Sequence, residues 1–173
     1  ERIPALVGLS IESSRPLHVS LGSTGIGDES TLLAITSAEL AYQVTSRASI
    51  GDASPILTMT NTSAIPLGQD TLRRAYYQRN LGERYSPTNV RWYPNGPRSL
   101  VFAAAISAMI KDDDVAANIM GGSYGAELAL ITDASRRRDV PIVAYSNQLE
   151  GQAVAYALAD EALIGEEIFA VGT

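Results

Sequence analysis

Short apolar runs alternate with longer segments of helical periodicity along most of the chain. The runs have the length of strands and are mostly apolar, which is typical of strands buried on both faces of a parallel sheet. They span residues 17–21, 56–60, 90–93, 116–120, 142–145 and 162–164. An opening segment with apolar residues at Ile3, Leu6, Val7 and Ile11 precedes the first run and has no assigned structure.

Helical periodicity fills the segments between these runs. The segments span residues 30–49, 68–81, 99–111, 126–137 and 151–158. Ser30, Asp70 and Ser99 lie near their starts, where a short polar side chain is favoured as an N-cap. Strands that alternate with helices predict an α/β fold. We therefore expect one doubly wound, Rossmann-like domain over residues 1–173, with a mostly parallel sheet of about five to six strands flanked by helices.

Composition removes several classes of chemistry. The chain has 173 residues, no cysteine, and His18 as its only histidine. It therefore offers no thiolate and no cluster of ligands of the kind that a structural metal needs. The net charge is −6 and Lys111 is the only lysine, which argues against nucleic-acid binding because that binding relies on Lys and Arg. We expect neither a metal nor another cofactor.

Hydropathy indicates a soluble chain. No uninterrupted apolar stretch approaches the roughly 18 residues that a membrane-spanning helix needs. The chain begins at Glu1 and stops at Thr173, directly after an apolar segment. We expect it to be the soluble part of a longer protein.

The loops after the predicted strands are rich in glycine and in small polar side chains. In a doubly wound sheet, ligands bind outside the carboxyl ends of the strands, where these loops enter the following helices. Hydroxyl and amide groups there can donate or accept hydrogen bonds. The binding candidates at this edge are Ser20, Gly22, Ser23, Asn61, Ser123, Tyr124 and Asn147.

The turn from Gly22 to Gly27 resembles the strand-to-helix turn of short-chain dehydrogenases, with its Gly-x-x-x-Gly-x-Gly spacing. Leu21 occupies the position of the first glycine, and Asp28 places negative charge where a pyrophosphate would lie. The Tyr-x-x-x-Lys pair of that family is absent. An NAD(P)-binding reductase that uses this turn is one alternative, and a plain glycine-rich connection is the other.

Residues 121–125 read Gly-Gly-Ser-Tyr-Gly, a formal Gly-x-Ser-x-Gly between a predicted strand and a predicted helix. A nucleophile elbow lies in that position in α/β-hydrolases. Those enzymes supply their histidine after the serine, and no histidine follows Ser123. His18 would have to act in a different chain order. A serine hydrolase that uses Ser123 is a second alternative, while small residues that allow a sharp turn and close helix packing are the simpler interpretation.

Carboxylates form a third feature of this edge. Glu127 lies at the start of the fourth helix that flanks the sheet, and Glu166 and Glu167 follow the last run. Paired carboxylates can hold a divalent cation or exchange a proton. They also stabilise the positive ends of helices while facing water, and we favour this second interpretation.

Three motifs carry a resemblance that covers nearly the full length. They are Arg-Pro-Leu-His-Val-Ser-Leu-Gly at 15–22, Gly-Ala-Glu at 125–127, and Leu-Ile-Gly-Glu-Glu at 163–167 with Phe169, Ala170 and Gly172. In order and spacing they resemble an uncharacterised bacterial family, a domain of unknown function found in membrane-anchored proteins where hydrophobic helices flank it. The resemblance implies a membrane-tethered parent and no particular reaction. It adds His18, Glu127 and Glu166 to the binding candidates.

Our leading hypothesis is a non-catalytic ligand-binding or assembly domain of a membrane-anchored bacterial protein. We expect the Gly22 turn, the Gly121 to Gly125 turn and the Gly165-Glu166-Glu167 end to converge on one crevice that takes a small-molecule ligand. With 46% apolar and 18% charged residues, the domain can present an apolar face to a copy of itself. The expected partners are a homo-oligomer and, through flanking segments, a membrane; nucleic acid is not expected.

Overall fold

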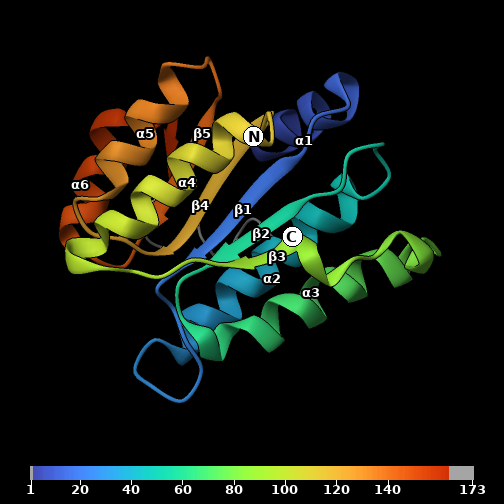
Figure 1. The fold of residues 1–173 in the computed structure, drawn as a ribbon, viewed down its shortest axis with the longest axis horizontal. Helices are drawn as coiled ribbons and strands as arrows, with labels where there is room; N and C mark the ends of the chain where they lie inside the picture. Colours follow the sequence, from blue (N-terminus) through green and yellow to red (C-terminus); the bar gives the residue numbers. More distant parts are fainter. Residues whose placement is uncertain (1, 164–173) are drawn as a thin grey trace.

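One sheet organises the computed structural model, which describes residues 2–163. Its strands are β1 (Leu17–Gly22), β2 (Ile56–Met59), β3 (Val90–Trp92), β4 (Ala117–Ser123), β5 (Ile142–Ser146) and β6 (Glu161–Ala162). They lie in the order β3-β2-β1-β4-β5-β6, and all neighbours are parallel. The strand order reverses at β1, which pairs with β2 on one side and β4 on the other (Figure 1). This confirms the predicted doubly wound sheet.

Helices cover both faces of the sheet. They are α1 (Arg2–Ser13), α2 (Thr31–Ala48), α3 (Ile65–Gln78), α4 (Leu100–Asp112), α5 (Leu128–Arg136) and α6 (Leu149–Leu158). Four short 3-10 helices lie in the connections, at Thr62–Ala64, Gly82–Arg84, Pro87–Asn89 and Pro97–Ser99. The first three α-helices pack on one face, and α4, α5 and α6 form a layer on the other (Figure 1).

Alternation along β1 separates the two cores. All six residues of this strand are buried, because helices cover both of its faces. Leu17, Val19 and Leu21 belong to the core beneath α1, α2 and α3. His18 and Ser20, at the alternate positions, point to the face that α4 and α5 cover. A central strand of this kind therefore buries polar groups as well as apolar ones.

The structure corrects two local predictions. The unassigned opening segment is the helix α1, whose Ile3, Leu6 and Val7 are buried at helical spacing. Asp70 is wrong as an N-cap, because α3 already begins at Ile65 and Asp70 lies inside it. There its carboxylate pairs with two arginines of the next turn instead.

The other two predicted caps stand at the expected positions but do not cap with their side chains. Ser30 precedes α2 and Ser99 precedes α4, and neither side chain makes an N-cap hydrogen bond. The last predicted strand is β6, which ends at Ala162, and residue 164 of that run lies outside the described residues.

Candidate functional site at the carboxyl ends of the strands

The loops that follow β1 and β4 lie side by side at the carboxyl edge of the sheet. Gly22 and Ser123 are partners in the strand pairing. The backbone N–H and the hydroxyl of Ser23 both donate to the Ser123 carbonyl, at 3.3 and 3.1 Å. The structure thus brings the Gly22 turn and the Gly121 to Gly125 turn together. The third member of the expected crevice, with Glu166, lies outside the described residues.

Tyr124 fills the crevice between the ends of β1 and β4. Its side chain is 1% exposed, and its ring stacks on Phe102 of α4 with 6.5 Å between the ring centroids. Burial raises the pKa of the Tyr124 hydroxyl well above its usual value, so the hydroxyl stays protonated. A Cβ on Gly22 would lie 2.8 Å from this ring and from the Ser123 carbonyl oxygen. The point at which the strand order reverses is therefore closed by packing.

The Ser123 hydroxyl pairs with an amide. Gln148 donates from Nε2 to the Ser123 Oγ, and the two atoms are 2.7 Å apart. Asn147 has an exposed side chain next to Gln148, and its backbone N–H donates to the Gly122 carbonyl at 3.3 Å. A Cβ on Gly122 would overlap the Leu21 carbonyl group. These contacts favour the packing interpretation of the Gly-x-Ser-x-Gly segment.

His18 lies in the middle of β1 and is completely buried. Its Nδ1 pairs with Oδ1 of Asn118 at 2.9 Å, and its Nε2 pairs with Oγ1 of Thr58 at 2.8 Å. Asn118 donates onward to the Ser135 hydroxyl of α5 at 2.8 Å. Burial lowers the pKa of His18 to about 4, so the ring is neutral at pH 7. His18 therefore links three strands, and neither of its nitrogens is available to Ser123.

The turn from Gly22 to Gly27 uses its backbone N–H groups within its own loops. Four consecutive N–H groups donate to hydroxyls at 2.8 to 3.2 Å: Gly25 to Ser30, Ile26 to Ser63, and Gly27 and Asp28 to Thr31. A dinucleotide site would direct such groups at the pyrophosphate. The Asn61 side chain also packs directly on Gly25, where a Cβ would overlap it. The turn is a packed connection.

Two further candidates have partners close to them in the chain. Ser20 is completely buried, and its hydroxyl accepts the Gly22 N–H at 3.2 Å. Both carboxylate oxygens of Glu127 accept the Gly125 N–H at 2.9 Å, at the start of α5. Within residues 2–163 there is no group of three or more His, Cys, Asp or Glu that could hold a metal.

A polar hollow of about 260 Å³ opens over the ends of β1, β2 and β3. The residues that line it all carry hydroxyl or amide side chains: Ser23, Thr60, Asn61, Thr62 and Asn95. Ser23 and Asn61 are predicted candidates, whereas the other three are missed. Thr62 and Asn95 could have been found because both lie in strand-end loops. Thr60 closes a predicted strand, and nothing in the sequence distinguishes it.

Hydrogen bonds between the three strand ends hold the floor of this hollow. The Thr60 N–H donates to the Gly22 carbonyl at 3.0 Å, and Trp92 donates from Nε1 to the Thr60 carbonyl at 2.9 Å. The Asn61 side-chain oxygen accepts both the N–H and the hydroxyl of Ser63, at 3.0 and 2.8 Å. The backbone beneath the hollow is therefore preorganised.

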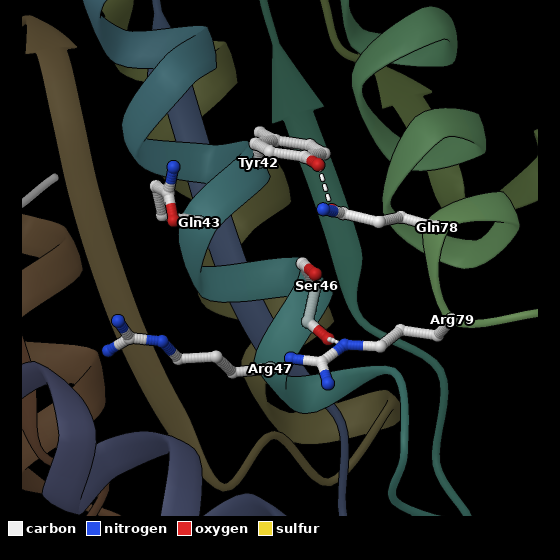
Figure 2. Close-up of a pocket in the computed structure, with 6 residues that line it drawn as sticks. All are labelled: Tyr42, Gln43, Ser46, Arg47, Gln78 and Arg79. Atoms are coloured by element: carbon white, nitrogen blue, oxygen red, sulfur yellow. Dashed lines mark hydrogen bonds between the residues drawn. The ribbon is translucent and has the colours of Figure 1, made fainter.

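A second hollow, of about 400 Å³, lies between the carboxyl halves of α2 and α3. Figure 2 shows its lining, which is Tyr42, Gln43, Ser46, Arg47, Gln78 and Arg79. The Tyr42 hydroxyl donates to the Gln78 side chain, and Arg79 donates from Nε to the Ser46 carbonyl at 3.1 Å. Arg47 extends away from Arg79 (Figure 2). Because the guanidinium groups point apart and one of them binds a helix carbonyl, we assign no ligand site here.

Comparison with known proteins gives one family match. A family model described as "Domain of unknown function (DUF6754)" matches residues 1–173. No curated protein matches the chain. Among solved structures, that of Acinetobacter baumannii MurG is 14% identical with a TM-score of 0.49, and the match covers 85% of this chain and 41% of that chain. This chain therefore spans less than half of the MurG chain.

The family match confirms the predicted resemblance to a domain of unknown function. The bacterial source and the membrane anchor that the resemblance implies stay predictions. Among residues 2–163, no helix is both long enough and apolar enough to span a bilayer.

Proposed function

Since the chain belongs to the DUF6754 family, a family of unknown function, we propose its function from the site: non-catalytic binding of a small uncharged molecule in the hollow over β1, β2 and β3. One observation carries this proposal. Every residue that lines the hollow offers a hydroxyl or an amide, and none carries a charge. Such groups donate and accept hydrogen bonds without selecting either sign of charge. A polyhydroxylated ligand, such as a sugar or another polyol, matches this set.

The size and place of the hollow support the same ligand class. Its volume of about 260 Å³ lies just below the roughly 300–1,000 Å³ typical of sites for drug-sized ligands, so it suits a molecule of monosaccharide size. It opens at the carboxyl ends of parallel strands, where doubly wound folds bind their ligands. The side chains of Thr62 and Asn95 are exposed to an incoming molecule. The preorganised floor reduces the ordering that binding requires.

The surroundings of the hollow support binding without catalysis. A general base must have a titratable group within hydrogen-bond reach of the proton that it removes. The lining contains no such group. The two groups that the hydrolase hypothesis needs have other partners, since His18 pairs within the sheet and Ser123 with Gln148. The N–H groups that a reductase would use for phosphate are engaged as well.

The experiment is an NMR titration of the amide-labelled chain with D-glucose and myo-inositol at millimolar concentrations. We expect chemical-shift changes confined to residue 23, residues 60–62 and residue 95. Asn95→Ala should weaken the affinity by about three- to tenfold, the equivalent of one lost hydrogen bond. Asn147→Ala is the matched control, because Asn147 is an exposed asparagine at the same edge outside the hollow. It should leave the affinity unchanged.

Two outcomes would contradict the proposal. One is the absence of shift changes with either polyol. The other is a titration with NADPH that shifts residues 25–28, because this result would favour the reductase alternative and a charged ligand.

A further inference from the structure

The outer surface of the α4, α5 and α6 layer is apolar although it faces solvent. The exposed fractions are 49% for Leu100 and 43% for Val101 in α4, 50% for Leu130 in α5, and 80% for Leu149 and 77% for Tyr156 in α6. A surface helix normally places charged and polar residues on this side. The three helices form one layer (Figure 1), so their apolar side chains belong to one side of the molecule.

The helix α6 shows this arrangement at helical spacing. Leu149, Ala153 and Tyr156 are exposed, and positions i, i+4 and i+7 lie on one face of a helix. Gly151 and Ala155 are buried on the opposite face, against the sheet. The helix is therefore apolar on both faces, and among residues 2–163 no other element covers the outer one.

The opposite layer has a different surface. In α3, Arg73 and Arg74 are exposed and pair with Asp70 at 2.6 and 3.3 Å. In α4, by contrast, no charged residue precedes Lys111. The exposed helix surface is thus polar on one side of the sheet and largely uncharged on the other.

The size of the apolar layer is that of a dimer interface. Its helices have 13, 9 and 10 residues, which makes them about 14 to 20 Å long at about 1.5 Å per residue. With axes about 8–10 Å apart, the three side by side are about 25 to 30 Å wide. A standard interface buries about 800 Å² per partner. That area is about a tenth of the 8187 Å² surface of the described domain.

We infer that this layer is the contact surface of a homodimer, in which a second copy of the chain packs its own α4, α5 and α6 against it. A twofold interface uses the same patch on both copies, and an apolar patch with little charge is complementary to itself. Each copy carries a net charge of −6, so the two repel each other at long range. Added salt screens that repulsion and leaves apolar contacts in place. Dimerisation should therefore strengthen with ionic strength.

The experiment is sedimentation velocity of the 173-residue chain over a range of protein and salt concentrations. We expect a reversible monomer–dimer equilibrium. Leu149→Glu and Tyr156→Glu should each raise the dissociation constant by at least about tenfold, because each buries a charge in the interface. Tyr77→Glu is the matched control, because Tyr77 is 63% exposed on the opposite layer. It should leave the equilibrium unchanged, and circular dichroism should show that all variants keep the fold.

Several outcomes would overturn the inference. A strict monomer at every concentration excludes the homodimer. A dimer that Tyr77→Glu disrupts, but the α6 variants do not, places the contact on the other layer. A monomer that binds uncharged phosphatidylcholine vesicles through Leu149 and Tyr156 assigns the surface to a membrane instead.

Discussion

Two regions of the carboxyl edge are built from similar residues and differ in shape. The β1–β4 crevice and the β1–β2–β3 hollow both consist of loops with glycines, hydroxyls and amides. The crevice is closed, because the Tyr124 ring occupies it over Gly22. The hollow is open, because its lining contains only small and medium polar side chains. The binding position in this domain therefore depends on one large side chain next to the strand-order reversal.

The comparison also shows that a glycine-rich turn has more than one use. A residue without Cβ lets any group approach the backbone closely. In a dinucleotide site that group is a phosphate, whereas at Gly22 it is the ring of Tyr124. Glycine spacing by itself does not distinguish a ligand from a packed side chain. The difference between the two regions can be tested by removing the ring, the glycine, or the buried polar network that runs across the sheet.

The largest effect is expected from Tyr124→Ala in the closed crevice. Removing a completely buried aromatic ring should lower the free energy of unfolding by about 3–5 kcal/mol. Urea denaturation of the two proteins measures this difference. Tyr124→Phe is the control, since the hydroxyl has no hydrogen-bond partner among the described residues, and it should change stability by less than about 1 kcal/mol. Equal losses in the two variants would show that the hydroxyl, and not the ring, stabilises the crevice.

A slightly smaller effect is expected from the pH dependence of His18, beneath both regions. Its pKa is lowered to about 4 in the folded chain, first by burial, against the hydrogen bond from Asn118. Arg91 lowers this pKa and Asp113 raises it, and these two side chains pair with each other at 2.7 Å. The unfolded chain binds a proton near pH 6.5, and the folded chain binds it only near pH 4.

Stability from neutral His18 is therefore fully present above pH 6.5 and is lost as the pH falls toward 4. The loss amounts to about 3 kcal/mol and levels off below pH 4, where both states are protonated. Urea denaturation at several pH values measures it, with His18→Gln as the variant that lacks this titration. An NMR titration that places the native pKa of His18 near 6.5 would contradict the expectation.

The smallest effect separates two glycines of the same turn. Gly22 and Gly27 have positive φ values of +61° and +98°, so alanine strains the backbone at both, by about 1–2 kcal/mol. A Cβ at Gly27 meets nothing within 4 Å, whereas at Gly22 it meets a ring and a carbonyl oxygen at 2.8 Å. Gly22→Ala should therefore destabilise by about 1–3 kcal/mol more than Gly27→Ala. Equal thermal unfolding of the two variants would mean that the crevice has room to relax.

Local pattern reaches a definite limit at the site. The loops that bear Ser23 and Asn61 are recognisable as strand-end loops, because apolar runs precede them. His18 shows the limit, since its place in a family-like motif makes it a binding candidate although the fold buries it at the centre of the sheet. Asp70 shows the same limit on a smaller scale, because a polar residue after a glycine has the composition of a cap and lies inside α3.

The sequence by itself determined the fold class, because the periods of apolar residues in strands and helices are local properties of the chain. It also determined which loops reach the carboxyl edge, since all parallel strands end at that edge. Only the tertiary structure decided which part of the edge is open. That outcome depends on contacts between residues far apart in the chain, such as Tyr124 on Gly22 and Asn61 on Gly25. Such contacts follow from how the strands are ordered and packed, and no local pattern encodes them.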